Sequence, residues 1–294
     1  MRVCRLVQVS TFALTIVTAA AVSHAQTQQP PNQVMPDLNA PRPIDIRDSV
    51  WLEELTWMEV RDLMKAGKTT IIVPTGGVEQ NGPYLAAGKH NYVLQATCPA
   101  IAKKLGNALC APVVPFVPEG DIDPPTQHMK YPSTISLTET TYRAMLTDIA
   151  SSLKSHGFER IILIGDSGGN QAGMKAVATD LAARWAGSRT AIRFIPEYYD
   201  YPGTYKWADQ ALGWDEKVEG LHDDPIITTT MMTVNPDLVR IKERQAKGKA
   251  SINGISLVPI DQAVAAGRRI VEHRADVTVE AIKKAFASNP STRQ

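Results

Sequence analysis

The feature that most constrains the fold is a repeated alternation of short apolar runs with amphipathic stretches. The run "ERIILIG" (159–165) has no polar break in its apolar part, which is typical of a strand covered on both faces. Three further segments have the composition of strands: "TTIIVPTG" (69–76), "NALCAPVVPF" (107–116) and "RTAIRFIP" (189–196). Helical spacing predicts helices at 91–105, between the capping Thr138 and Gly157, and at 171–185. The alternation predicts an α/β protein with a mostly parallel sheet between layers of helices.

The first 25 residues have the pattern of a secretory signal peptide. They combine a basic start (Arg2 and Arg5), an apolar run over about 11–22 and a small-x-small site at 23–25. The alternative is an uncleaved membrane anchor, but the apolar run is shorter than the roughly 20 residues that a span requires. We therefore expect cleavage before Gln26 and export, in a bacterium to the periplasm, with no membrane association after cleavage.

Composition indicates how the rest of the chain is organised. Residues 26–49 begin with a stretch rich in Pro, Gln and Asn, which predicts a flexible lead-in. No second linker or internal repeat follows, so residues 50–290 are predicted to form a single domain. The formal net charge of +1 gives no reason to expect nucleic acid as a partner.

Two cysteines, Cys98 and Cys110, remain after the predicted cleavage. An oxidising compartment permits a disulfide between them. Both also lie in apolar surroundings, which suits buried thiols equally well. The sequence leaves these two states open, and it contains no cysteine-based zinc motif.

Unusual polar residues gather in two loops that follow predicted strands. In parallel sheets, ligand sites form at the carboxyl ends of the strands. "TGGVEQNGPY" (75–84) follows the first strand and "GDSGGNQ" (165–171) follows the third. Each candidate also has a purely structural interpretation. Glu79, His90 and Asp166 could cap backbone amides at turns or helix starts, and His222 could pair with neighbouring surface acids.

Several segments resemble, in the same order, the motifs of the creatininase family of amidohydrolases. These segments are "PTGGVEQNGPYLAAGKH" (74–90), "HMKYPSTISL" (128–137), "GFERIILIGDSGGN" (157–170) and "GLHDDPIITTTMMTVNPDLVR" (220–240). The resemblance extends from about residue 72 to about residue 282. It implies a three-layer α/β/α domain, commonly assembled into hexamers. It also implies two divalent ions, zinc or manganese, that activate a water for attack on a small amide.

The chain departs from the family pattern at most of the implied metal ligands. Glu79 keeps the acid of the first metal loop. Asn81 replaces a metal-binding histidine, and His90 replaces the bridging aspartate. Ser167 replaces the histidine of the Gly-Gly turn, and Ile227 stands where the resemblance expects a glutamate. A two-metal centre with the family's ligands cannot be built from these side chains.

A different metal centre remains a hypothesis. Glu79, His90 and Asp166 offer two carboxylates and an imidazole, a plausible set for one zinc or manganese ion with an open position for water. The alternative is an ion pair between His90 and Asp166. His222, which matches the family's proton-transfer histidine, and Glu79 are the predicted catalytic residues.

The remaining candidates are predicted to contact substrate. A segment rich in Tyr and Trp (198–214) could form a pocket wall or, alternatively, an oligomer contact. The predicted substrate-binding residues are Asn81, Tyr84, His128, Ser167, Gly168, Gly169, Asn170 and Trp207.

The sequence therefore predicts an exported, homo-oligomeric amidohydrolase that cleaves a C–N bond in a small amide or cyclic amide. One alternative is a catalytically inactive periplasmic binding or assembly protein that kept the fold. Another is an enzyme that works without metal, with Glu79 and His222 as an acid–base pair.

Overall fold

The computed structural model describes residues 35–215 and 222–287. The predicted signal peptide (1–25) lies outside the described residues, as do the first part of the lead-in and the end of the predicted domain. The chain divides into two units, 1–41 and 42–294, and the fold described below is that of the second. The predicted limits of the lead-in (26–49) and of the domain (50–290) stay predictions.

A parallel four-stranded sheet forms the middle layer, in the order β2-β1-β3-β4. Its strands are β1 (Thr70–Thr75), β2 (Ala108–Cys110), β3 (Arg160–Gly165) and β4 (Ala191–Phe194). β1 and β3 pair along their full length, from Thr70 opposite Arg160 to Thr75 opposite Gly165. Because both strands end level with each other, the two polar loops that follow them emerge at the same edge of the sheet.

The strands form here because their side chains are apolar on both faces. All six residues of β1 are buried, and so are five of the six in β3. Ile71 and Val73 face one core cluster, which also receives side chains from α3 and α4, while Ile72 faces a second cluster with α2 and α8. Alternate side chains of a strand point to opposite faces, so an unbroken apolar run requires cover on both.

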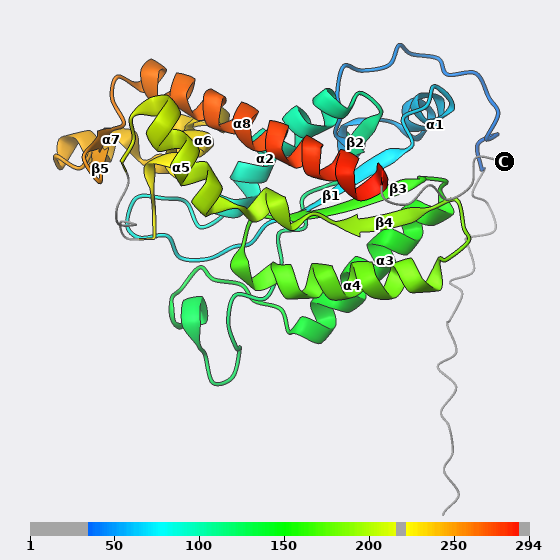
Figure 1. The fold of residues 1–294 in the computed structure, drawn as a ribbon, viewed down its shortest axis with the longest axis horizontal. Coiled ribbons are helices and arrows are strands. Elements are labelled where there is room, and N and C mark those ends of the chain that lie inside the picture. Colours follow the sequence, from blue (N-terminus) through cyan, green and yellow to red (C-terminus); the bar gives the residue numbers. More distant parts are fainter. Residues whose placement is uncertain (1–34, 216–221, 288–294) are drawn as a thin grey trace, which may run out of the picture. The chain divides into compact units, whose positions relative to one another are not determined.

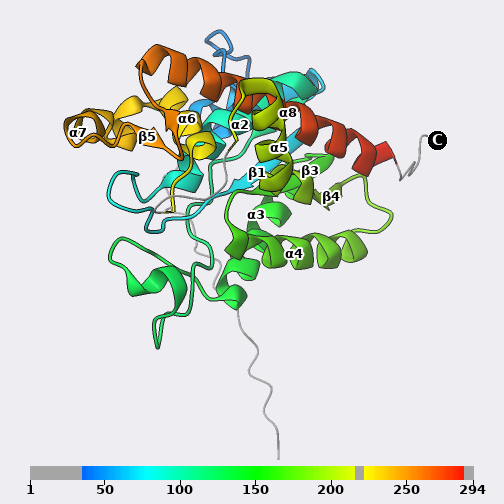
Figure 2. The ribbon, with the colours of Figure 1, turned by 60° about the vertical axis from the view of Figure 1, so that its left-hand side comes forward.

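Helices supply that cover, as the two views of the ribbon show (Figures 1 and 2). α3 and α4 lie against one face, and α2 and α8 against the other. α5, α6 and α7 lie beyond the carboxyl ends of the strands (Figure 1). The helices are α1 (Trp57–Lys65), α2 (Lys89–Leu105), α3 (Glu139–Ser155), α4 (Gln171–Arg184), α5 (Tyr201–Leu212), α6 (Pro225–Val234), α7 (Ile241–Ala246) and α8 (Ile260–Ala287). The predicted three-layer α/β/α fold with a mostly parallel sheet is confirmed.

Local signals fix the helix ends. Thr138 accepts a hydrogen bond from the Thr141 amide and so caps α3, as predicted. Gly106 ends α2 with a φ of +78°, a backbone conformation that favours glycine. α2 begins at Lys89, slightly before the predicted start at Asn91, and this shift brings Lys89 and His90 into its first turn.

Two further features complete the fold. Cys98 on α2 and Cys110 on β2 are joined by a disulfide, which answers the question that the sequence left open. A two-stranded hairpin of β5 (Ser251–Ile252) and β6 (Ile255–Ser256) precedes α8. Within 35–215 and 222–287, no helix combines the length and the apolar character needed to cross a membrane.

Candidate active site

A cavity of about 640 Å³ opens at the carboxyl ends of β1 and β3. Glu79, His90, Asp166 and His222 all line it, so the structure brings the four main candidates together. A larger hollow of about 1040 Å³ lies elsewhere, between α2 and α8. Its lining contains no histidine, and its glutamates are exposed. The buried carboxylates and imidazoles that could take part in catalysis line the smaller cavity.

Glu79 is the centre of the cluster. One carboxylate oxygen, Oε1, lies 2.8 Å from His90 Nε2, 2.8 Å from His222 Nε2 and 3.1 Å from Lys89 Nζ. The other oxygen, Oε2, lies 3.3 Å from His128 Nε2. The Glu79 side chain is 2% exposed. A buried carboxylate surrounded by this many nitrogen groups is held in the ionised state and in one position.

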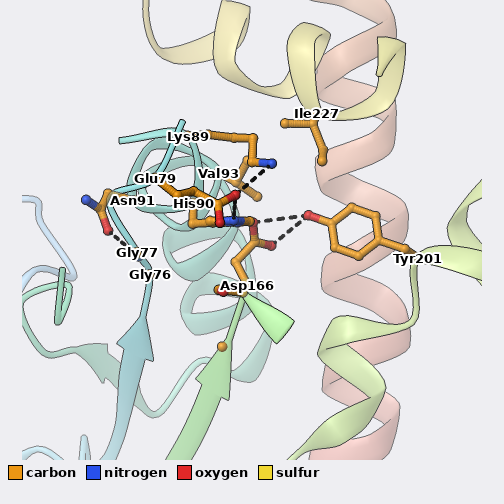
Figure 3. A network of polar contacts seen from close by, with 12 residues as sticks. Gly76, Gly77, Glu79, Lys89, His90, Asn91, Val93, Asp166, Tyr201 and Ile227 are labelled. Atoms are coloured by element: carbon orange, nitrogen blue, oxygen red, sulfur yellow. Dashed lines mark hydrogen bonds and ion pairs between the residues drawn. The ribbon is translucent and has the colours of Figure 1, made fainter. Parts of the chain in front are cut away.

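His90 lies between two carboxylates, as the close-up shows (Figure 3). Its Nδ1 is 2.8 Å from Asp166 Oδ2, on the opposite side of the ring from Glu79. Asp166 also accepts hydrogen bonds from Tyr201 Oη, at 3.0 Å, and from an Arg274 nitrogen, at 2.9 Å. Arg274 and Tyr201 therefore hold Asp166, and Asp166 fixes the ring of His90.

Glu119 enters the site from the loop that follows β2. Its Oε2 accepts a hydrogen bond of 3.0 Å from the Ser167 hydroxyl. Its Oε1 is buried, and among the described residues no donor reaches it. A side chain at Gly77 would collide with this carboxylate, so the glycine makes room for Glu119. A buried Glu119 oxygen that receives no donor can carry a proton or bind a positive ion.

Burial and the neighbouring charges set the pKa values of the two glutamates apart. Burial alone would raise the pKa of Glu79, but hydrogen bonds from His222 and His90 and the charge of Lys89 place that pKa well below its usual range. Burial first, and the charge of Glu79 second, raise the pKa of Glu119 to about 8. The site therefore contains one strongly acidic carboxyl beside one that holds a proton at neutral pH.

The pKa values of two other side chains at the cavity, His90 and Tyr199, are also shifted. Burial and Lys89 would lower the pKa of His90, but its hydrogen bonds to Asp166 and Glu79 leave that pKa raised. Burial raises the pKa of Tyr199 to about 12, so its hydroxyl stays protonated and can donate a hydrogen bond.

Among the residues that the structure describes, two groups of side chains, both containing Glu79, bring donor atoms close enough to hold a metal ion. One group is Glu79, His90 and Glu119, all buried; the other is Glu79, His128 and His222. Because no donor among the described residues reaches Oε1 of Glu119, this atom is available as a ligand, and carboxylates with imidazole suit zinc or manganese. The residues present thus fit one divalent ion.

The predicted ligand set needs a correction. Glu79, His90 and Asp166 do converge, but His90 lies between the two carboxylates. A single ion can bind only one nitrogen of the ring, so an ion on the Glu79 side cannot also reach Asp166. Asp166 contacts the other ring nitrogen, as in the ion-pair alternative, and Glu119 takes its place among the possible ligands.

The predicted substrate contacts divide into two sets. His128, Ser167, Gly168 and Gly169 line the cavity. The other four predicted contacts do not, because their side chains are used in the scaffold. Asn81 and Asn170 donate to backbone carbonyls, Tyr84 lies under the Arg244 guanidinium at 4.8 Å, and Trp207 stacks on His273 at 4.4 Å.

Three residues that act in the site were not predicted. Lys89 and Glu119 line the cavity, and Arg274 anchors Asp166 from α8. The sequence held a signal for only one of them: Lys89 lies next to His90, so a helix start there carries both side chains to the strand ends. Glu119 stands in an irregular loop and Arg274 in an ordinary amphipathic helix, and neither pattern points to a site.

A parallel sheet between helix layers, with a buried cluster of carboxylates and imidazoles at its carboxyl edge, defines an α/β/α protein with the groups needed for hydrolysis. The family model described as "Creatininase: Creatinine amidohydrolase" matches residues 53–282. The chain therefore belongs to the creatininase family, whose members act on C–N bonds other than peptide bonds.

Individual relatives agree with this assignment. The creatinine amidohydrolase of Pseudomonas putida is 27% identical over 224 residues, which cover 73% of this chain and 83% of the relative. A crystal structure of creatinine amidohydrolase matches with a TM-score of 0.56 and 22% identity, covering 84% of this chain and all of that one. A mutant creatininase described as of Zn-Zn type matches with a TM-score of 0.55 and 23% identity, over 82% and 98% of the two chains. These structures show the shared fold.

Proposed function

We propose that the protein is an exported amidohydrolase that hydrolyses the C–N bond of a small amide or cyclic amide with the help of one zinc or manganese ion. The observation that carries the proposal is the position of Glu79, whose carboxylate is shared by every group of potential ligands at the strand ends. Glu79, His90 and Glu119 would hold the ion. When bound, such an ion polarises a carbonyl and lowers the pKa of a bound water.

The chain's own residues supply the other functions of a hydrolytic site. His222 and His128 stand at the partly exposed side of the cavity, with ring centroids 4.7 Å apart. Burial lowers the pKa of His128. A neutral imidazole can take a proton from an attacking water and return it to the leaving nitrogen. The protonated hydroxyl of Tyr199 can donate to substrate, and Ile227 forms an apolar wall.

A second function is favoured by a specific observation. Lys89 neutralises part of the Glu79 charge, and Ser167 and Ile227 occupy positions where the resemblance expects metal ligands. These features suit a binding or assembly protein that has lost catalysis and keeps the cavity for a small molecule. The distinction between the two functions is whether the purified protein turns over any amide.

Turnover of small amides tests the proposal directly. We expect the mature protein to hydrolyse at least one member of a panel of small amides. A linear amide should release ammonia or an amine, whereas a cyclic amide such as creatinine should open its ring and gain one water, which mass spectrometry detects. Treatment with a chelator should lower the rate at least about tenfold, and added manganese or zinc should restore it. No turnover across the panel by a metal-loaded, folded protein would contradict the enzyme and favour the binding protein.

Export is part of the same proposal. The disulfide between Cys98 and Cys110 supports it, because such bonds persist in oxidising compartments. When the full-length chain is expressed in a Gram-negative host, we expect the periplasmic fraction to contain a protein that begins at Gln26. Intact-mass measurement checks this, with an Ala25→Arg variant as the control that should remain uncleaved. A full-length protein in the cytoplasmic fraction would contradict export.

The native protein is further proposed to be a homo-oligomer, a hexamer by family resemblance.

A further inference from the structure

Lys89 places an ammonium group beside the carboxylate that both possible metal groups share. Its Nζ lies 3.1 Å from Glu79 Oε1, and its side chain is only 2% exposed (Figure 3). Lys89 is also the first residue of α2, at the end of a helix that disfavours positive charge. A buried ammonium is costly unless it is paired, and here it pairs with Glu79.

The charge balance of the site leaves little room for two divalent ions. Asp166 is already paired with Arg274, at 2.9 Å. The other carboxylates of the two ligand groups are Glu79 and Glu119, and Lys89 neutralises part of their charge. One divalent ion would already exceed the negative charge that Lys89 leaves, and a second would put further like charges around a single buried carboxylate.

Geometry indicates which position the single ion takes. Both ligand groups need Glu79, so they compete for it. The buried group contains the Oε1 of Glu119, which no donor among the described residues reaches. Ile227, at the cavity wall, adds no ligand. The buried group thus has a ligand atom that no donor among the described residues reaches, which favours this group as the position of a single ion.

We propose that Lys89 is a built-in cation whose ammonium takes the place of a second metal ion, so that the site holds at most one divalent ion, bound by Glu79, His90 and Glu119. The inference rests on the proposed function in one respect, which is that both concern the same site. It differs from the arrangement of the matched creatininase structure described as of Zn-Zn type.

Metal binding tests this inference without any assay of catalysis. Mature protein stripped by chelator is titrated with manganese chloride in a calorimeter, and bound metal is counted after dialysis by elemental analysis. We expect wild-type protein to bind no more than one ion. Lys89→Met, which keeps the length of the side chain without its charge, and Lys89→Gln should bind manganese at least about tenfold more tightly or take up a second ion. Lys175→Met, an exposed lysine on α4, should behave as wild type.

The outcomes separate this inference from the proposed function. Two ions on the wild-type protein would overturn it whatever the variants do. Unchanged affinity and stoichiometry in either Lys89 variant, folded by circular dichroism, would also overturn it. An apo wild-type protein whose Lys89 variants gain an ion would support the inference while contradicting metal assistance. A failure to hydrolyse amides would contradict the proposed function alone.

Discussion

Replacing Glu79 with glutamine is expected to lower kcat/KM for the amide substrate by at least about 10²–10³-fold. Glutamine has the size of glutamate but carries no charge, and its amide nitrogen can only donate. His90, His222 and Lys89 all present nitrogens to Glu79 Oε1, so one side chain change disturbs three contacts at once. Steady-state kinetics with the best amide of the panel measures the effect.

A control variant and a chelator series allow this experiment to distinguish a metal-assisted mechanism from a metal-free one. Glu197→Gln, an exposed carboxylate on the short helix after β4, should stay within about twofold of wild type because surface substitutions rarely matter. If turnover survives the chelator but is lost in Glu79→Gln, Glu79 and His222 act as an acid–base pair without metal. A Glu79→Gln enzyme with wild-type kinetics would remove Glu79 from the mechanism altogether.

The backbone of the site could be predicted because it depends on local patterns. "ERIILIG" and "TTIIVPTG" are apolar on both faces, so they had to be buried strands in a layered α/β fold. Parallel strands end at one edge, and this alone brought Glu79 and Asp166 together. "NALCAPVVPF" gave a much shorter strand, Ala108–Cys110, because its prolines cannot donate to a ladder.

The roles of individual side chains depend on long-range contacts, and these were harder to predict. Asn81 and Asn170 have the right chemistry for binding substrate, but nearby backbone carbonyls take their amides. Arg274 contacts Asp166, which is 108 residues away in the sequence, and the amphipathic pattern of α8 does not predict this contact. The sequence predicted which loops meet, but not which atoms face one another.

Ser167 illustrates how the site has changed relative to the family pattern. The resemblance expects a metal-binding histidine at this position. In this structure the Ser167 hydroxyl instead donates to Glu119, at 3.0 Å, and Glu119 supplies a carboxylate to the ligand group. The loss of one ligand is therefore accompanied by support for another, which argues for a remodelled site over a decayed one.

Replacing Arg274 with methionine is expected to destabilise the protein by about 3–5 kcal/mol. Arg274 is 4% exposed; its guanidinium donates to Asp166 at 2.9 Å and to the Tyr198 carbonyl at 3.1 Å. It also lies over the rings of Tyr198 and Tyr201. Methionine keeps much of the packing but leaves the fully buried Asp166 carboxylate without its cation. Urea unfolding of the mature protein at pH 7 measures the change.

The pH dependence of this loss distinguishes a charge effect from a packing effect. In the wild type, burial would raise the pKa of Asp166, but Arg274 and His90 outweigh it and the pKa lies below its usual range. That carboxylate therefore adds stability above about pH 4, which is lost as pH falls through the lowered pKa. Without Arg274, burial should raise the pKa above its unfolded value, so the variant loses stability as pH rises through it. The difference in unfolding free energy between the two proteins should thus shrink toward pH 4.

Arg268→Met, an exposed change on the same helix, should cost less than about 0.5 kcal/mol at every pH. A loss for Arg274→Met that is constant from pH 4 to pH 8 would mean that packing against the tyrosines, and not the charge on Asp166, is what Arg274 contributes.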